Sequence, residues 1–187
     1  EPLTVAQGET LGIASSRTHS AVAVHGALAV AGGTKDAPVV LTVTEARAVG
    51  GAAGAAARAG MDAYDLLTKP PATPPDRLFP VVWTPLYLLM GIAMGCVWRA
   101  ASGSARRQAA ALWCVQLGVN GFWPVVFFLW QAHGGAFFLL AGLIALVLAM
   151  SAQFSRRDPA AAWLCVPYLL WLLFAAYLNL GVWLLNR

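Results

Sequence analysis

Four long apolar runs constrain this chain more than any other feature of its sequence. They cover roughly residues 79–98, 109–130, 135–154 and 160–185. Each is near or above the length of about 20 residues that an α-helix needs to cross the hydrocarbon core of a bilayer. With 59% hydrophobic and only 11% charged residues among 187, the composition is too apolar for a soluble domain. The runs therefore predict an all-α integral membrane bundle.

Short links join the four runs, so neighbouring helices are expected to run antiparallel. The breakers in these links are Gly103 with its flanking serines, the pair Gly134-Gly135, and residues 156–159. Two links fall on the same side of the membrane and together carry five arginines: Arg99, Arg106, Arg107, Arg156 and Arg157. The positive-inside tendency predicts that this side is cytoplasmic. The net charge of +4 thus reflects topology, and no nucleic-acid partner is expected.

A weaker candidate span precedes these runs, at about residues 39–57. Glu45 and Arg47 lie within it, and each costs roughly 2.5–3.5 kcal/mol at a helix centre on insertion scales. Small residues at Ala46, Gly50 and Gly54 would let the segment pack closely against neighbours already in the membrane. It is predicted as a marginal first helix, and a disordered alanine-rich leader is the alternative.

The predicted organisation is therefore a five-helix bundle over residues 39–187, with a loop at 58–78 between the first and second helices. Residues 1–38 are expected to form a poorly ordered N-terminal extension. Their apolar content is mostly alanine, glycine and valine, and no convincing signal peptide is recognised there.

Two polar side chains lie inside the second strong run. Asn120 is at mid-span and Gln116 lies one helical turn earlier, so both are expected to point into the bundle, where polar groups can find partners. An alternative role for Asn120 is simply to bond a neighbouring helix. The three cysteines and three histidines are scattered, and no carboxylate lies in the four runs. Neither a metal site nor conventional acid–base catalysis is predicted.

Three ordered motifs carry a resemblance to a known family. The first is YDLLTKP at 64–70, followed by Pro74-Pro75 and FPVVWTPLYLLMG at 79–91. The second is QLGVNGFWP at 116–124 with Phe127-Phe128, and the third is PYLLW at 167–171 with a following Leu178-Asn179. Together they resemble the TspO/MBR family, the tryptophan-rich sensory proteins and translocator (peripheral-type benzodiazepine receptor) proteins.

The resemblance implies a five-helix bundle around a pocket that binds porphyrins and, in some members, cholesterol and benzodiazepine-type ligands. It also implies a homodimer. By motif position the ligand-binding residues would be Tyr64, Phe79, Trp83, Tyr87, Gln116, Asn120, Trp123, Trp171, Ala175 and Leu178, with Lys69, Pro74 and Pro75 in the loop that covers the pocket. Positions that match Trp83 and Trp171 are associated in bacterial members with light-dependent porphyrin breakdown.

This chain departs from the family pattern in that same loop. The family usually reads KPxWxPPxW, whereas Ala72 and Arg77 replace both tryptophans here. The loop is therefore expected to pack differently over the pocket.

The residue types suit a flat, apolar macrocycle with carboxylates at its edge. Aromatic faces would stack on it, Asn120 would donate and accept without carrying a charge, and Lys69 or Arg77 would meet a propionate. Four other tryptophans are near span ends and are expected to form an interfacial belt: Trp98, Trp130, Trp163 and Trp183. A sterol motif after Tyr177 is not supported, because the next basic residue is Arg187.

The predicted function is a multi-pass membrane receptor or regulator, of bacterial type, that binds protoporphyrin IX or a related tetrapyrrole as ligand and requires no cofactor. The alternatives are a light-dependent porphyrin-degrading enzyme that uses Trp83 and Trp171, and a porphyrin or sterol transporter. The GxxxG segment from Gly91 to Gly95 would permit dimerisation, but packing within the chain explains it equally well.

Overall fold

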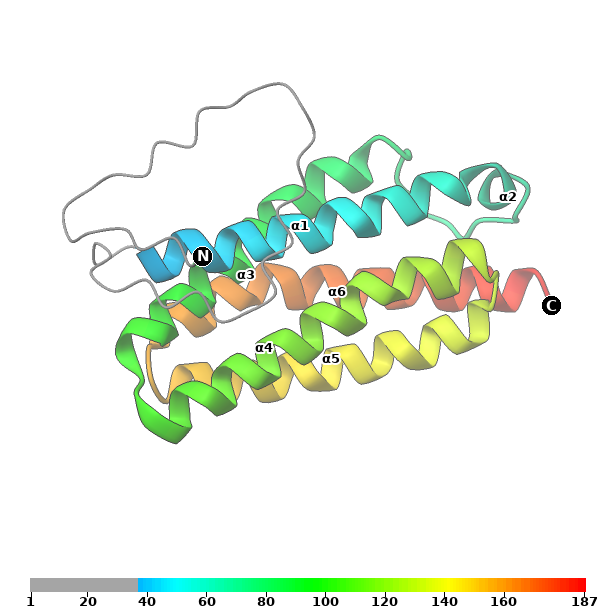
Figure 1. Cartoon of the computed structure of the whole chain (residues 1–187). Helices are drawn as coiled ribbons and strands as arrows, with labels where there is room; N and C mark the ends of the chain where they lie inside the picture. Colours follow the sequence, from blue (N-terminus) through cyan, green and yellow to red (C-terminus); the bar gives the residue numbers. More distant parts are fainter. Residues whose placement is uncertain (1–36) are drawn as a thin grey trace, which may run out of the picture. The chain divides into compact units, whose positions relative to one another are not determined.

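In a computed structural model of the protein, residues 37–187 are described, and this part of the chain contains helices and no strand (Figure 1). The helices are α1 (Ala37–Ala59), α2 (Met61–Asp65), α3 (Leu78–Ala100), α4 (Gly103–Pro124), the π-helix η1 (Val125–Leu129), α5 (His133–Ser155) and α6 (Pro159–Leu185). The prediction for residues 1–38 lies outside the described residues, apart from the two that begin α1.

Four of these segments are long and apolar enough to cross a membrane: α3, α4 continued by η1, α5 and α6. They correspond to the four runs of the sequence. The all-α membrane fold is thereby confirmed, and the chain is an integral membrane protein.

The helices of residues 38–187 form a ring. α5 packs against α4 and α6, α6 against α3, and α3 against α4. The chain passes back and forth, so that both arginine-rich links lie at one end, whereas α2, η1 and the C-terminus lie at the other (Figure 1). The core between the helices is filled by large side chains that are almost fully buried: Met90, Met94, Leu140, Leu143, Met150, Phe154, Tyr168 and Leu172.

α1 packs against α3 and α4 by close approach, through Val43 at Gly91 and Val49 at Gly121. The Thr42 hydroxyl donates to the Gly91 carbonyl at 2.7 Å. A Cβ atom added to Gly91 would lie only 2.5 Å from the Cα of Val43. Gly91 of the GxxxG segment therefore serves packing within the chain, because α1 occupies the space that a second copy would need.

The segment between α1 and α3, predicted as a loop, contains the short helix α2. Its Tyr64 is buried, with ring centroids 5.9 Å from Phe127 and 5.4 Å from Phe128. These contacts with η1 hold α2 in place.

Pro124 precedes η1, where the Trp130 amide donates to the Val125 carbonyl at 2.9 Å. The end of this span is thus wider than an α-helix.

Candidate functional site: an aromatic cluster with a buried polar network

α3 brings three aromatic side chains to one face. Phe79, Trp83 and Tyr87 are spaced four residues apart, which places them in a row along the helix. The ring centroids of Trp83 and Tyr87 lie 5.6 Å apart. The row faces α6, where Tyr168 lies 6.3 Å from Trp83.

Trp171 of α6 completes the cluster. Its ring lies 6.3 Å from Trp83 at an interplanar angle of 88° and 6.3 Å from Phe79, both in edge-to-face geometry. Its indole Nε1 is buried and has no hydrogen-bond partner within residues 37–187. A buried indole N–H normally finds a partner, so this donor is available for a ligand acceptor.

Beside the aromatic rings runs a continuous polar network. The Tyr87 hydroxyl donates to Asn120 Oδ1, and Asn120 Nδ2 donates to the Tyr168 hydroxyl at 2.8 Å. Tyr168 in turn donates to Gln116 Oε1 at 3.1 Å, and Gln116 Nε2 contacts the Met90 sulfur at 3.7 Å. The two amides predicted to point inward do so, and they join α3, α4 and α6 through side-chain hydrogen bonds.

A small cavity adjoins this cluster. It measures about 10 Å³, which is room for about one water molecule. Four helices contribute to its lining, which consists of Trp83, Asn120, Trp123, Leu140, Leu143, Leu172 and Ala175. A drug-sized ligand needs a pocket of about 300–1,000 Å³. The cavity is therefore too small for a ligand of that size, which could enter only if the helices or their side chains separated.

Trp123 links the cluster to the end of the bundle where α2 lies. Its ring stacks on Phe127 at 5.0 Å, and its Nε1 donates to Asn179 Oδ1 at 3.4 Å. Asn179 also donates to the carbonyl of His133 at 2.9 Å. Leu178, the residue before Asn179, is buried.

Tyr64 lines a different cavity at this end, also about 10 Å³, together with Phe127, Phe128 and His133. Burial, with smaller contributions from the carboxylates of Asp76 and Asp65, raises the pKa of Tyr64 to about 12. Its phenol is therefore neutral at physiological pH. The structure separates Tyr64 from the cavity that Trp83 and Asn120 line.

The cations expected near the mouth differ in availability. Lys69 forms an ion pair with Asp65 at 2.9 Å, and its ammonium lies 4.3 Å from the centre of the Tyr64 ring. Arg77 is exposed. Pro74 and Pro75 lie in the same connecting segment and line neither of the two cavities.

Hydrogen bonds to α6 hold this connecting segment in place. Asn186 accepts from the Thr68 amide and donates to the Thr68 carbonyl, both at 2.9 Å. The Tyr177 hydroxyl donates to the Pro71 carbonyl at 2.9 Å. These contacts fasten the segment that contains Ala72 and Arg77.

Several site residues were missed at the sequence level. Tyr168 is the centre of the polar network, and its position in an apolar run beside Pro167 was a signal that could have found it. Asn179 is likewise a polar residue within an apolar run. Leu140, Leu143 and Leu172 are indistinguishable in sequence from their apolar neighbours, because their role depends only on helix rotation.

Comparison with known proteins places this chain in a family. The sequence profile of the TspO/MBR family matches residues 39–184, which span α1 and all four membrane-length helices. The chain belongs to the TspO/MBR family. The match includes the weakly apolar α1, so this helix is part of the family fold.

Individual proteins similar to this chain support the family match. The chain is 38% identical to protein CrtK of Rhodobacter capsulatus over 128 residues, 66% of this chain and 78% of the relative. It is 37% identical to the translocator protein of Ovis aries, over 66% of this chain and 75% of that protein. It is also 37% identical to the tryptophan-rich sensory protein of Cereibacter sphaeroides, over 66% and 76%. Family membership supports a membrane receptor or transporter type of role.

Proposed function

We propose that this protein binds a porphyrin between α3, α4, α5 and α6, and acts as a membrane receptor or regulator for it. The observation that carries the proposal is the buried, unpartnered Nε1 of Trp171 in edge contact with Trp83 and Phe79. A macrocycle that inserts between the rings of Trp171, Trp83 and Phe79 would gain aromatic contact on its faces. A pyrrole nitrogen or edge carboxylate gains the indole N–H as a donor.

Binding has to enlarge this small cavity. Leu140, Leu143 and Leu172 line the cavity together with Trp83 and Asn120, so some of these side chains have to move when a ligand enters. The bound form is then a minor conformation in the absence of ligand, and the apparent affinity is reduced by the fraction of open protein. For this reason the association rate constant is expected to lie below the diffusion limit.

The test is a titration with protoporphyrin IX in the dark, followed by the absorbance of the porphyrin in vesicles or detergent. Trp171→Ala and Asn120→Ala are each expected to weaken saturable binding about ten-fold or more. Trp163→Ala is the matched control. It removes one tryptophan, as Trp171→Ala does, but the Trp163 side chain is 74% exposed on the outside of the bundle. Binding that is unchanged in Trp171→Ala would reject the proposed site.

A second function has a specific observation in its favour. Trp83 and Trp171 are in direct contact, and both adjoin the cavity or its aromatic wall, so either indole would lie close to an excited porphyrin. In light-dependent breakdown, molecular oxygen would add to the photoexcited porphyrin and cleave the macrocycle. A neighbouring indole would lend an electron to the excited macrocycle and recover it when the oxygen adduct collapses. Illumination in air should then yield a product that Trp83→Phe and Trp171→Phe abolish and Trp163→Phe retains. If illumination of the parent protein gave no product, the enzyme function would be rejected and the binding function would stand as the single proposal.

A further inference from the structure

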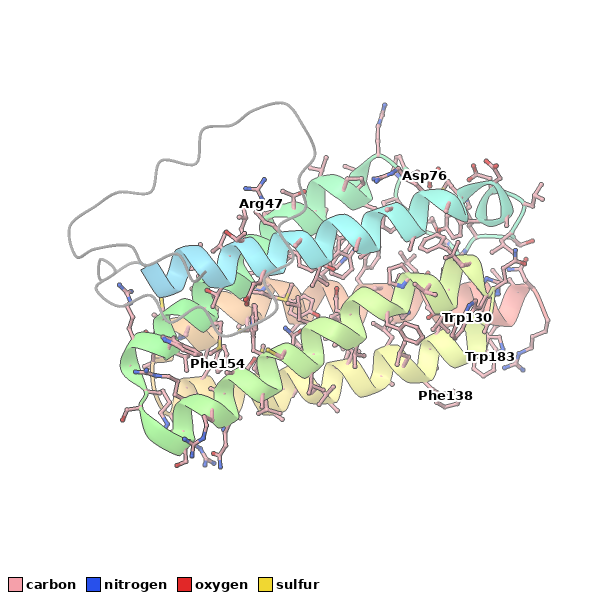
Figure 2. The ribbon with its side chains drawn as sticks, in the orientation of Figure 1. Arg47, Asp76, Trp130, Phe138, Phe154 and Trp183 are labelled. Atoms are coloured by element: carbon pink, nitrogen blue, oxygen red, sulfur yellow. The ribbon has the colours of Figure 1, made fainter. Side chains whose placement is uncertain are left out.

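One end of the bundle is strongly basic. The link from α3 to α4 and the link from α5 to α6 both lie there (Figure 1), as does Phe154 in the last turn of α5 (Figure 2). Asp158 in the second link accepts from two backbone amides at the start of α6, at 2.9 and 3.4 Å, so its carboxylate serves as a helix cap. Four arginines in or beside the links form no ion pair within residues 37–187: Arg106, Arg107, Arg156 and Arg157. The described part of the chain therefore leaves the positive charge of this end without a neutralising partner.

The opposite end, where Asp76, Trp130 and Trp183 lie (Figure 2), carries charges of both signs. Lys69 and Asp65 pair there at 2.9 Å. The basic residues of that end are Arg58, Lys69, Arg77 and Arg187, and the acidic residues are Asp62, Asp65 and Asp76. A large excess of positive charge thus belongs to the end with the two links, and a negatively charged partner is expected there.

Exposed tryptophans mark the depth of the basic end in the membrane. Trp98 and Trp163, which are 36% and 74% exposed, lie near the end of α3 and near the start of α6. Tryptophan side chains favour the headgroup level of a bilayer. Arg156 and Arg157 directly follow Ser155, the last residue of a membrane-length helix. Long basic side chains at this depth place their charged groups among the lipid phosphates.

Arg106 is held in a position that suits a phosphate. Its Nε donates to the Ala101 carbonyl at 2.8 Å, and its guanidinium carbon lies 5.3 Å from the centre of the Trp98 ring. The two terminal nitrogens of the guanidinium have no hydrogen-bond partner within residues 37–187. They form a planar fork that matches two oxygens of a phosphate. Because the side chain is already ordered, little conformational entropy is lost when the fork binds.

We propose that this basic end binds the headgroup of an anionic phospholipid. The fork of Arg106 receives the phosphate, and Arg107, Arg156 and Arg157 supply the surrounding positive charge. α4 and α5 pack side by side and run in opposite directions, so the start of α4 and the end of α5 share this end. The axes of packed helices are about 8–10 Å apart, a gap that one headgroup can bridge. The ligand is a lipid rather than a soluble phosphate, because the site lies at headgroup depth beside exposed tryptophans.

Lipid selectivity tests the proposal. The protein is reconstituted in phosphatidylcholine vesicles, and electron paramagnetic resonance measures how strongly it immobilises spin-labelled phosphatidylglycerol relative to spin-labelled phosphatidylcholine. One basic residue near a membrane surface changes association with anionic lipid about five-fold, so the parent should favour phosphatidylglycerol by at least this factor. R106Q/R107Q should abolish the preference, and R156Q/R157Q should reduce it.

R58Q/R187Q is the matched control, because it removes the same number of positive charges from the opposite end. This variant should keep the preference for phosphatidylglycerol, and all three variants should keep the helical circular dichroism of the parent. No preference in the parent, or an equal loss in the control, would overturn the proposal.

Lysine substitutions test the fork separately from charge. R106K and R107K both keep the positive charge and remove a guanidinium, but only Arg106 is held against Trp98 and Ala101. R106K should therefore lower the preference for phosphatidylglycerol more than R107K does. Equal preferences in the two variants would overturn the role of the Arg106 fork.

Competition distinguishes a lipid from a soluble anion. Inorganic phosphate and sodium chloride are added to the parent at equal ionic strength, so that charge screening is the same in both samples. The preference for phosphatidylglycerol should weaken equally in the two salts. A loss confined to phosphate would assign the site to a soluble anion and overturn the lipid proposal.

Discussion

α1 and α6 are both helices of the same ring, but they are held in it by different interactions. α6 is apolar along its length and is joined to the bundle by side-chain hydrogen bonds from Tyr168, Asn179 and Asn186. α1 consists largely of alanine and glycine and makes a side-chain hydrogen bond to Gly91 through Thr42. Its contacts are close approaches of backbone, at Gly50, Gly91 and Gly121.

The difference shows two ways for a helix to stay in a membrane protein. α6 would enter the bilayer by its own hydrophobicity, and its polar groups then select its neighbours. α1 has too little apolar surface for that, so its position depends on neighbours shaped to receive it. Small residues suit this task, because close packing replaces the hydrophobic driving force that lipid does not supply.

The largest effect is expected from Gly91→Leu. Because a Cβ at this position would be 2.5 Å from the Val43 Cα, α1 has to move away from α3, and overpacking should cost about 3 kcal/mol. Denaturation in mixed micelles measures the loss, and proteolysis within residues 37–59 reports the release of α1. Gly142→Leu serves as control. Unchanged stability and protection of α1 would show that its packing does not depend on this approach.

Tyr168→Phe tests the polar attachment of α6. The change removes a hydroxyl that accepts from Asn120 and donates to Gln116, and it leaves two buried amides one partner short. A loss of about 2 kcal/mol is expected in the same denaturation measurement. Tyr177→Phe removes an exposed hydroxyl bonded to Pro71 and should cost clearly less. Equal losses for the two variants would contradict a special role for the central network.

Thr42→Val tests the polar contact of α1 with nearly unchanged side-chain volume. Loss of the buried bond to the Gly91 carbonyl should destabilise the protein by about 1 kcal/mol, less than the loss of close packing at Gly91 itself. Thr84→Val is the control, since Thr84 bonds to Pro80 within its own helix and is exposed. If Thr42→Val proved as damaging as Gly91→Leu, hydrogen bonding rather than close approach would hold α1.

Asn186→Ala should have the smallest effect on stability, below about 0.5 kcal/mol, because its bonds to Thr68 are exposed. The local effect should be clear: hydrogen exchange of the Thr68 amide is expected to accelerate, as the segment before α3 loses its attachment to α6. Leu184→Ala, an exposed neighbour on α6, controls for the change of side-chain size. Unaltered exchange at Thr68 would show that other contacts fasten the segment.

Much of the site followed from single residues whose polarity conflicts with their surroundings. Asn120 and Gln116 were predicted to face inward because hydrocarbon cannot satisfy an amide, and both are buried in the network. The contact of Lys69 with a propionate stays a prediction. In the folded chain the Lys69 ammonium pairs with Asp65 and lies over the ring of Tyr64, two contacts that the sequence reasoning did not give.

The sequence by itself determined the all-α membrane fold, the positions of the four strong spans and the inward direction of their polar groups. These properties depend on local length and polarity measured against the thickness and dryness of a bilayer. Only the tertiary structure decided that leucines of α5 and α6 line the cavity beside Trp83, that Tyr64 lines another cavity, and that Gly91 receives α1. These features depend on helix rotation and on close approach between segments far apart in the chain.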